Sequence, residues 1–405
     1  MSKFELGVWV SRQFPKTWTH VIKGSFADPQ FDTRAATDLF CYDRNAGIGA
    51  FFATVKNGKL DDGTLVQDGP HQVGANHTFS RRWTHIVNGP FAPPFPGGVQ
   101  LLFYDATSGV GEFYATDGLG NLTLKKHHSG WRTSWTLILA GHFGTANLLF
   151  YDATDGTGAF YSVDSSGNMH LIRTYHGWLT SWHSIITGNF SSSQNDDLLF
   201  YDKSRGIGVF YKIDGDAKTT LFSEHDNWRK TWQHIVSGQF LQNATYDGLL
   251  FYEENSGHTE FYSTDGHGSI SQIDVNVGSQ WSLPWQVILA GEFTPNIGLI
   301  GTSRLCSYDS RDGAIRYFYF ELVTIKTVID VNGRWTDGSS QSAVISAAFT
   351  SLTVDMSAYH RPAAHGSIID GSTITVTFPD DATYTGKLQP PNTIRWSNGS
   401  AWRKI

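Results

Sequence analysis

One stretch, residues 177–211, decides the fold because it holds all three elements of a repeat that runs through the chain. It reads GWLTSWHSIITGNF at 177–190, DLLFYD at 197–202 and GIGVFY at 206–211. The first element has the pattern Trp-x-x-Ile-x-x-Gly-x-Phe. With few replacements, it recurs at Trp18, Trp83, Trp135, Trp182, Trp232 and Trp285. Each copy is followed by an apolar run that ends in Tyr and an acid, and then by a glycine turn leading into paired aromatic residues.

The spacing of this repeat predicts a β-propeller. Successive tryptophans of the first element are 65, 52, 47, 50 and 53 residues apart. Periods of about 40 to 50 residues, each with several short strands, are typical of propeller blades. The apolar spacing of helical repeats is missing from the DLLFYD and GIGVFY elements. We therefore expect an all-β fold in which residues 1–325 form a propeller of four-stranded antiparallel sheets. Six blades are counted, and a seventh is left open.

The two ends of the chain differ from the repeat. Residues 4–10 look like the fourth strand of a blade, which predicts that the N-terminus pairs with the last blade and closes the ring. Residues 326–405 alternate apolar and polar residues between Asp-Gly and Asn-Gly turns, as short antiparallel strands do. This pattern predicts a small antiparallel β-barrel, and a degenerate seventh blade is the alternative.

Composition excludes several classes of protein. The chain has 405 residues, of which 40% are hydrophobic and only 17% charged, and its net charge is -7. A disordered chain would be less hydrophobic and more charged, and a nucleic-acid binder would be basic. The N-terminus lacks the pattern of a signal peptide, and no run of ~18 apolar residues predicts a membrane span. We expect a cytoplasmic protein, or one released by a non-classical route.

Two cysteines, Cys41 and Cys306, are too few for a disulfide framework. Free buried thiols are expected, with a structural pair as the alternative. The sequence contains no metal-ligand spacing, phosphate loop or nucleophile motif. We therefore expect no metal, no cofactor and no catalytic residue.

The aromatic residues fall into two classes. The six repeated tryptophans occur in every copy and are most simply packing residues between blades. Four residues earlier, a second aromatic position holds Phe14, Phe79, Trp131, Trp178, Trp228 and Trp281. This position lies where a strand leaves a glycine turn, near the rim of a blade. A flat ring there suits either contact with the C–H face of a sugar or plain rim packing, and the sequence leaves both open.

A recurrent acid closes the second element of each copy, at Asp43, Asp105, Asp152, Asp202, Glu253 and Asp309. It is expected either to form the turn by accepting backbone N–H bonds or to bind sugar hydroxyls. Neither role makes it catalytic. A glycosidase needs two carboxylates in unequal environments about one bond, whereas the six copies predict equal environments.

The quoted stretch resembles the blade repeat of the Photorhabdus-type β-propeller lectins, and the resemblance covers about four fifths of the chain. That family implies a seven-bladed propeller that binds fucose or O-methylated sugars between adjacent blades through aromatic side chains. The tail resembles small lipocalin- or avidin-like barrel modules. On this resemblance and the residue pattern together, the expected sites contain Trp131, Trp178, Trp228 and Trp281, with Tyr151, Tyr201 and Tyr252 nearby.

The sequence thus predicts a non-enzymatic, multivalent lectin for fucosylated or methylated glycans that acts in host–microbe recognition or defence. A homo-oligomer is compatible with it. Two alternatives are a propeller glycosidase and a toxin-associated or scaffold protein whose propeller binds protein.

Overall fold

The computed structural model describes residues 3–26, 37–54, 70–89, 91, 99–241, 244–277, 281, 284–293, 303–323, 331–348, 351–370, 372–389 and 392–405. The described residues are mainly strands, with the short 3₁₀ helix η2 in the C-terminal part of the chain. The chain divides into two compact units, one spanning Phe4–Glu321 and the other beginning at Leu322. None of the described residues forms a helix with the length and hydropathy needed to span a bilayer.

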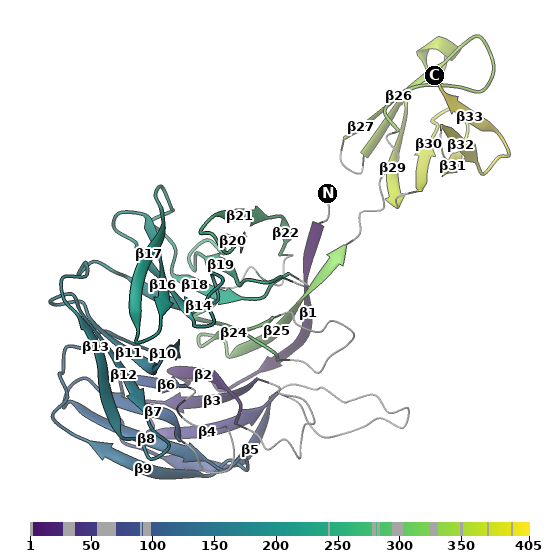
Figure 1. The fold of residues 1–405 in the computed structure, drawn as a ribbon. Helices are drawn as coiled ribbons and strands as arrows, with labels where there is room; N and C mark the ends of the chain where they lie inside the picture. The colour runs from purple at the N-terminus through teal and green to yellow at the C-terminus, as the bar shows by residue number, and fades with distance from the viewer. Residues whose placement is uncertain are drawn as a thin grey trace. The chain divides into compact units, whose positions relative to one another are not determined.

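The first unit is a six-bladed propeller (Figure 1), as the six repeats predict. Blade one contains β2 (His20–Gly24), β3 (Asp38–Asp43), β4 (Ile48–Ala53) and β5 (His71–Thr78). Blade two contains β6 (His85–Asn88), β7 (Val99–Asp105), β8 (Val110–Thr116) and β9 (Leu122–His128). Blade three contains β10 (Leu137–Phe143), β11 (Ala146–Asp152), β12 (Thr157–Val163) and β13 (Met169–Tyr175).

The remaining blades follow the same order. Blade four contains β14 (Ser184–Gly188), β15 (Asp197–Asp202), β16 (Ile207–Asp214) and β17 (Lys218–His225). Blade five contains β18 (His234–Gly238), β19 (Gly248–Tyr252), β20 (Thr259–Thr264) and β21 (Ile270–Ile273). Blade six contains β23 (Val287–Gly291), β24 (Arg304–Asp309), β25 (Ala314–Val323) and, from the other end of the chain, β1 (Lys3–Gln13).

The N-terminal strand closes the ring. β1 lies beside β25 as the fourth strand of blade six, and its outer edge pairs in parallel with the short β22 (Val275–Asn276). Leu6 on β1 is buried in the cluster between blades five and six. This arrangement confirms the predicted closure. It also covers the edge of the last blade, which would otherwise offer unpaired backbone groups.

The second strand of each blade packs on both neighbours, which explains its continuous apolar run. In β15, Leu198 and Phe200 belong to the cluster shared with blade three, whereas Leu199 and Tyr201 belong to the cluster shared with blade five. Successive strand residues point to opposite faces, so a strand covered on both faces has no polar side. Six such clusters lie between the six pairs of blades, and each contains one of the six repeated tryptophans, which are all buried. The packing interpretation of these tryptophans is confirmed.

Each glycine of the Gly-x-Gly element has a separate function. Gly156 has a φ of +71°, and its carbonyl oxygen accepts the backbone N–H of Trp178 at 3.0 Å. The second glycine, Gly158, lies directly against the Trp178 ring, since a Cβ there would be 2.2 Å from Cζ3. The first glycine therefore makes the turn, and the second leaves room for the ring.

The second unit is a closed antiparallel barrel of eight strands, which confirms the predicted barrel and excludes a seventh blade. Its strands are β26 (Gly333–Thr336), β27 (Ala343–Ala348), β28 (Ser351–Asp355), β29 (Ala364–Asp370), β30 (Thr373–Thr377), β31 (Thr383–Gln389), β32 (Thr393–Trp396) and β33 (Ala401–Lys404). The helix η2 (Ser357–Tyr359) lies between β28 and β29. Inward-facing residues such as Val354, Val376 and Ile394 fill the barrel core.

Both cysteines are free and buried, as the sequence predicts. Cys41 on β3 and Cys306 on β24 belong to one cluster between blades one and six. Burial raises the pKa of both thiols, so they remain protonated and serve as small apolar side chains.

The contact between Gly158 and Trp178 gives a test of the packing. We expect Gly158→Ala to lower the free energy of unfolding by about 1–3 kcal/mol, because the added methyl group overlaps the indole ring. Urea denaturation measures the loss. The matched control is the same change in a Trp178→Ala background, where the added methyl group meets no ring. An equal loss in both backgrounds would show that the ring does not require this glycine.

Candidate functional site

The second-strand tyrosines hold the loop that carries the aromatic residue of the next blade. The Tyr151 hydroxyl donates to the carbonyl oxygen of Leu179 at 2.6 Å, and the Tyr201 hydroxyl to that of Arg229 at 2.5 Å. These acceptors directly follow Trp178 and Trp228 in the chain. Tyr252 instead accepts the backbone N–H of Trp285 at 3.1 Å. All three predicted tyrosines have 0% exposure, so they lie beneath the candidate sites and position them.

Three of the four predicted tryptophans are partly exposed, and one is not. Trp131, Trp178 and Trp228 each lie against a second-glycine position, at Gly111, Gly158 and Gly208. The corresponding place before Trp281 holds Thr259, whose hydroxyl oxygen accepts the indole N–H at 2.7 Å. The Trp281 ring packs edge-on against Phe318 at 4.7 Å and has 0% exposure. In this structure, Trp281 is a core residue.

A crevice between blades two and three contains Trp131. It has a volume of about 530 Å³, which is within the usual range for small-molecule sites. Its aromatic and apolar walls are His128, Trp131, Trp135, Phe150, Ala159, Tyr161 and Met169. Its polar groups are Arg132, Thr157, Thr174 and His176. The segment joining the two blades forms one wall, and β11, β12 and β13 of blade three form the other.

Hydrogen bonds fix the walls of this crevice. The His128 ring lies tilted beside Trp131, with the ring centres 5.2 Å apart, and its Nε2 lies 2.8 Å from the carbonyl oxygen of Gly167 in blade three. Phe150 meets Trp131 edge-on at 5.6 Å. The Tyr104 hydroxyl donates to the carbonyl oxygen of Arg132 at 2.6 Å and so ties the same segment back to blade two. The Trp131 ring is therefore held from both sides.

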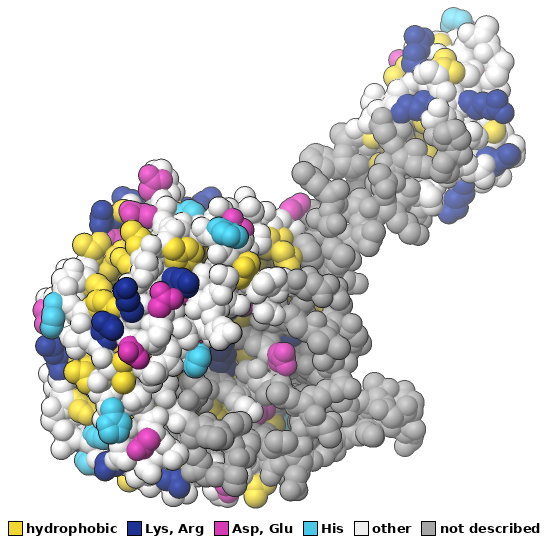
Figure 2. Space-filling view, viewed as in Figure 1, with side chains coloured by type: hydrophobic (Ala, Val, Ile, Leu, Met, Phe, Trp, Pro, Cys, Tyr) yellow, Lys and Arg dark blue, Asp and Glu magenta, His cyan; other side chains and the backbone are white. Residues whose placement is uncertain are grey.

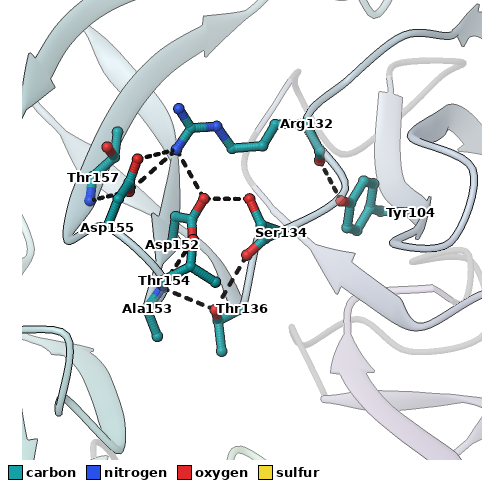
Figure 3. Close-up of polar contacts among 9 residues, drawn as sticks. All are labelled: Tyr104, Arg132, Ser134, Thr136, Asp152, Ala153, Thr154, Asp155 and Thr157. Atoms are coloured by element: carbon teal, nitrogen blue, oxygen red, sulfur yellow. Dashed lines mark hydrogen bonds and ion pairs between the residues drawn. The ribbon is translucent and has the colours of Figure 1, made fainter.

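Arg132 is oriented by two carboxylates (Figure 3). Its Nη1 lies 2.8 Å from Asp152 Oδ2 and 3.0 Å from Asp155 Oδ2, and its guanidinium lies 5.1 Å from the centre of the Trp135 ring. The hydrogen bond to Asp152 raises the pKa of Arg132. Within the described residues both ion pairs use Nη1, so the other N–H groups of the fork keep donor capacity for a ligand.

Asp152 itself is bound within the turn. Burial would raise its pKa, but hydrogen bonds from Ser134, Thr154 and Arg132 outweigh burial and lower it. The backbone N–H of Thr154 donates to Asp152 Oδ1 at 2.8 Å. Other recurrent acids accept a backbone N–H two or three residues ahead in the same way, namely Asp43, Asp105, Asp202 and Asp309. The turn-forming role of these aspartates is confirmed.

The six inter-blade crevices differ at one position on the third strand. The residue after the second-glycine position is Ala50, Glu112, Ala159, Val209, Glu260 or Arg316. Between blades four and five, Glu260 accepts hydrogen bonds from His258 and Tyr262 and pairs with Arg229 at 3.3 Å. Between blades two and three, Ala159 leaves this space open.

This position carries a signal that sequence reasoning missed. The variable residue of Gly-x-Gly-x-Phe-Tyr is small or apolar in three copies and charged in the other three, and only its place on the strand shows that it faces the space between blades. The sequence pattern indicates six equal copies. The structure shows that the surroundings of this residue differ from copy to copy.

A second cavity, about 880 Å³, follows the inner strands of the propeller. Most of its lining residues are apolar or glycine, and the polar ones are Lys23, Ser25, Thr37, Asn88, Thr187 and Glu292. The Lys23 Nζ donates to the carbonyl oxygen of Ala290 at 2.7 Å, and burial lowers its pKa. Among the described residues, no three His, Cys, Asp or Glu side chains come together as metal ligands would.

Comparisons with known proteins do not name a family for this chain. No family model matches it, and no curated protein matches it. The crystal structure of the Saccharomyces cerevisiae Sqt1 is among the similar solved structures, with 11% sequence identity and a TM-score of 0.36. That match covers 76% of this chain and 83% of that chain. It is too distant to carry an argument about function.

Because the second-strand tyrosines are buried, we expect the free energy of unfolding to fall at alkaline pH. Burial raises the pKa of Tyr104, Tyr151, Tyr201 and Tyr308 to about 12, against about 10 when exposed. Their contribution is fully present below pH ~10 and is lost as the pH rises from about 10 to about 12. Urea denaturation at several pH values, with tyrosinate absorbance as a second readout, measures this. Tyr151→Phe should make the decline shallower, and an unchanged decline would contradict the role of Tyr151.

Proposed function

We propose that the propeller is a non-enzymatic lectin whose principal sugar site is the crevice containing Trp131. One observation supports this most directly: an open crevice that joins two tryptophan faces to an oriented arginine and to threonine hydroxyls. The C–H face of a sugar ring packs on an aromatic face, and fixed donors and acceptors then select its hydroxyls.

The chemistry of the walls narrows the ligand. Ala159, Met169 and Phe150 add an apolar surface beside the rings, which suits a sugar that carries a methyl group. Fucose has such a group at C5, and an O-methylated sugar has one on an oxygen. The lectin resemblance noted from the sequence points to the same class, so fucosylated and O-methylated glycans are the proposed ligands, recognised in host–microbe contact or defence.

The crevice lacks the groups that glycosidic bond cleavage requires. None of its lining residues is a carboxylate, whereas a glycosidase places two about the scissile bond. The nearby Asp152 is engaged by Arg132 and has a lowered pKa, the opposite of what a general acid needs. Binding without turnover is therefore proposed.

More than one crevice can contribute to binding. Trp178, between blades three and four, faces the same kind of surface, with Leu179 and Val209 where the first crevice has Arg132 and Ala159. We propose it as a weaker and more apolar site. At Trp228 the Glu260 cluster occupies the space. Two or more linked sites raise apparent affinity for a glycan surface by ~10²–10⁴ when both engage together.

Protein binding is a second candidate function, favoured by a row of exposed leucines. Leu124, Leu171 and Leu221 occupy equivalent places on the outer strands of blades two, three and four, and they are 48%, 56% and 53% exposed. Figure 2 shows hydrophobic side chains gathered on the propeller where Figure 1 labels β13 and β17. Exposed apolar groups in register are typical of interaction surfaces. Haemagglutination that a simple monosaccharide inhibits would favour the lectin over this candidate.

The lectin proposal predicts the effect of two substitutions in the first crevice. Trp131→Ala should weaken binding to a glycan array about fivefold to thirtyfold, because a stacked ring contributes roughly 1–2 kcal/mol. Ala159→Glu should block the crevice while both tryptophans stay in place, because the longer side chain fills the space. Blades two and five have a glutamate at the equivalent position, Glu112 and Glu260.

The matched control is Thr133→Ala, an exposed residue of the same segment that does not line the crevice. It should bind as the unchanged protein does. Circular dichroism and urea denaturation show whether each variant is folded. Full binding by a folded Ala159→Glu variant would exclude this crevice as the main site.

A further inference from the structure

The C-terminal barrel has a pocket at one end, where four of its loops meet. The loops β26–β27, β28–β29, β30–β31 and β32–β33 each contribute to it, through Asp337, Tyr359, Asp381 and Asn398 respectively. The pocket has a volume of about 180 Å³. Sites for drug-sized ligands begin near 300 Å³, so this one suits a single small ring.

The floor and walls of the pocket are aromatic. Phe378, Tyr384, Trp396 and Trp402 line it. The Trp396 and Trp402 rings meet edge-on at 5.1 Å, and Phe378 lies 6.2 Å from Trp396. Their packing fixes the ring planes, so the pocket is formed before any ligand arrives.

The rim of the pocket carries oriented hydrogen-bonding groups. The Tyr384 hydroxyl donates to Asp381 Oδ1 at 3.0 Å, and the Tyr359 hydroxyl donates to Asp337 Oδ1 at 3.1 Å. Each tyrosine holds one carboxylate in place, and each carboxylate keeps further acceptor capacity. Arg361 is held by Asp380 at 2.8 and 2.9 Å and lies 5.3 Å above the Phe378 ring. Donors and acceptors therefore alternate round the opening.

One buried donor in the pocket has no partner. The indole N–H of Trp396 forms no hydrogen bond within the described residues, although Trp396 is only 5% exposed. In contrast, the third tryptophan of the barrel, Trp335, donates its indole N–H to the carbonyl oxygen of Val331 at 2.8 Å. A buried donor without a partner costs about 1–3 kcal/mol, so Trp396 is held here for its ring and not for its N–H.

We propose that this pocket binds a single neutral sugar ring, as a second carbohydrate site separate from the propeller. Sugar hydroxyls both donate and accept, and so match a rim that mixes Asp337 and Asp381 with Arg361, Asn398 and Ser400. The C–H face of the ring packs on Trp396 and Trp402.

The charges at the rim make other ligand classes less suitable. An anion would face the carboxylates of Asp337 and Asp381. A quaternary ammonium ion fits aromatic walls, but it would lie near the Arg361 guanidinium. The site lies wholly within the barrel and does not depend on the function proposed for the propeller.

The experiment observes the indole signals of the full chain by NMR with ¹⁵N-labelled tryptophan. Trp396→Phe and Trp131→Phe identify the signals of those two residues. The probes are the methyl glycosides of glucose, mannose, galactose, N-acetylglucosamine and fucose, each titrated separately, with tetramethylammonium as the cation probe. We expect at least one glycoside to shift the Trp396 signal in a saturable way.

Substitutions then test the contacts. Trp396→Phe reduces the aromatic face on which the sugar packs and should weaken binding about threefold to tenfold. The effect is read on the Trp402 signal, which Trp402→Phe identifies. Asp381→Asn should weaken it by a similar factor, because a carboxylate binds a hydroxyl more strongly than an amide does. Asp355→Asn changes an exposed carboxylate of the same barrel that does not line the pocket, and should leave affinity unchanged.

The two proposals fail separately. A sugar that shifts Trp131 while no probe shifts Trp396 would overturn the barrel site and leave the propeller site standing. A shift of Trp396 by tetramethylammonium, with none by any glycoside, would overturn the sugar assignment in favour of a cation. If Trp396→Phe fails to fold, as lost dispersion of all indole signals would show, Asp381→Asn decides the outcome.

Discussion

The propeller depends on one constraint: the second strand of every blade is apolar on both faces and must be covered on both. In β15 the two faces alternate residue by residue, with Leu198 and Phe200 toward one neighbour and Leu199 and Tyr201 toward the other. A single blade cannot cover such a strand. An open row of blades would leave the outer face of the first blade and that of the last blade exposed to water. Only a closed ring covers every face. The N-terminal strand β1 completes it by supplying the last edge of blade six.

The same constraint explains which parts of the fold could be predicted from the sequence. Residues that bury a blade face recur in every copy. The repeated tryptophans and the LLFYD run therefore predict the number of blades and the closed ring. The resemblance to seven-bladed lectins implied a larger ring, but this chain has six blades, and its remaining 80 or so residues form a barrel with its own period-two core. A residue that is repeated in every copy indicates a packing contact, because every blade needs the same packing.

The candidate site was less predictable, since it depends on how copies differ. Trp281 matches Trp131, Trp178 and Trp228 in sequence, but Thr259 replaces the glycine that seats the other three rings, and Trp281 lies in the core. The tyrosines Tyr151, Tyr201 and Tyr252 were expected beside the sites, but they lie below them with 0% exposure. A strand pattern shows which face a residue occupies. It does not show whether a neighbouring segment covers that face.

Side chains that differ between the blades can change the chemistry of a crevice while the backbone arrangement stays the same. The N–H groups of Trp131 and Trp178 donate to the carbonyl oxygens of Gly109 and Gly156, and together with the second-strand tyrosines these bonds hold both ring-bearing segments in the same place in their blades. One third-strand residue can then change from Ala159 to Val209 to Glu260 without moving the frame, because it points into the crevice between blades. An alanine opens the space, a valine narrows it, and a glutamate fills it with a paired charge. The size and charge of the space between blades therefore depend on a side chain that the fold does not need, so the copies can differ while the ring stays the same.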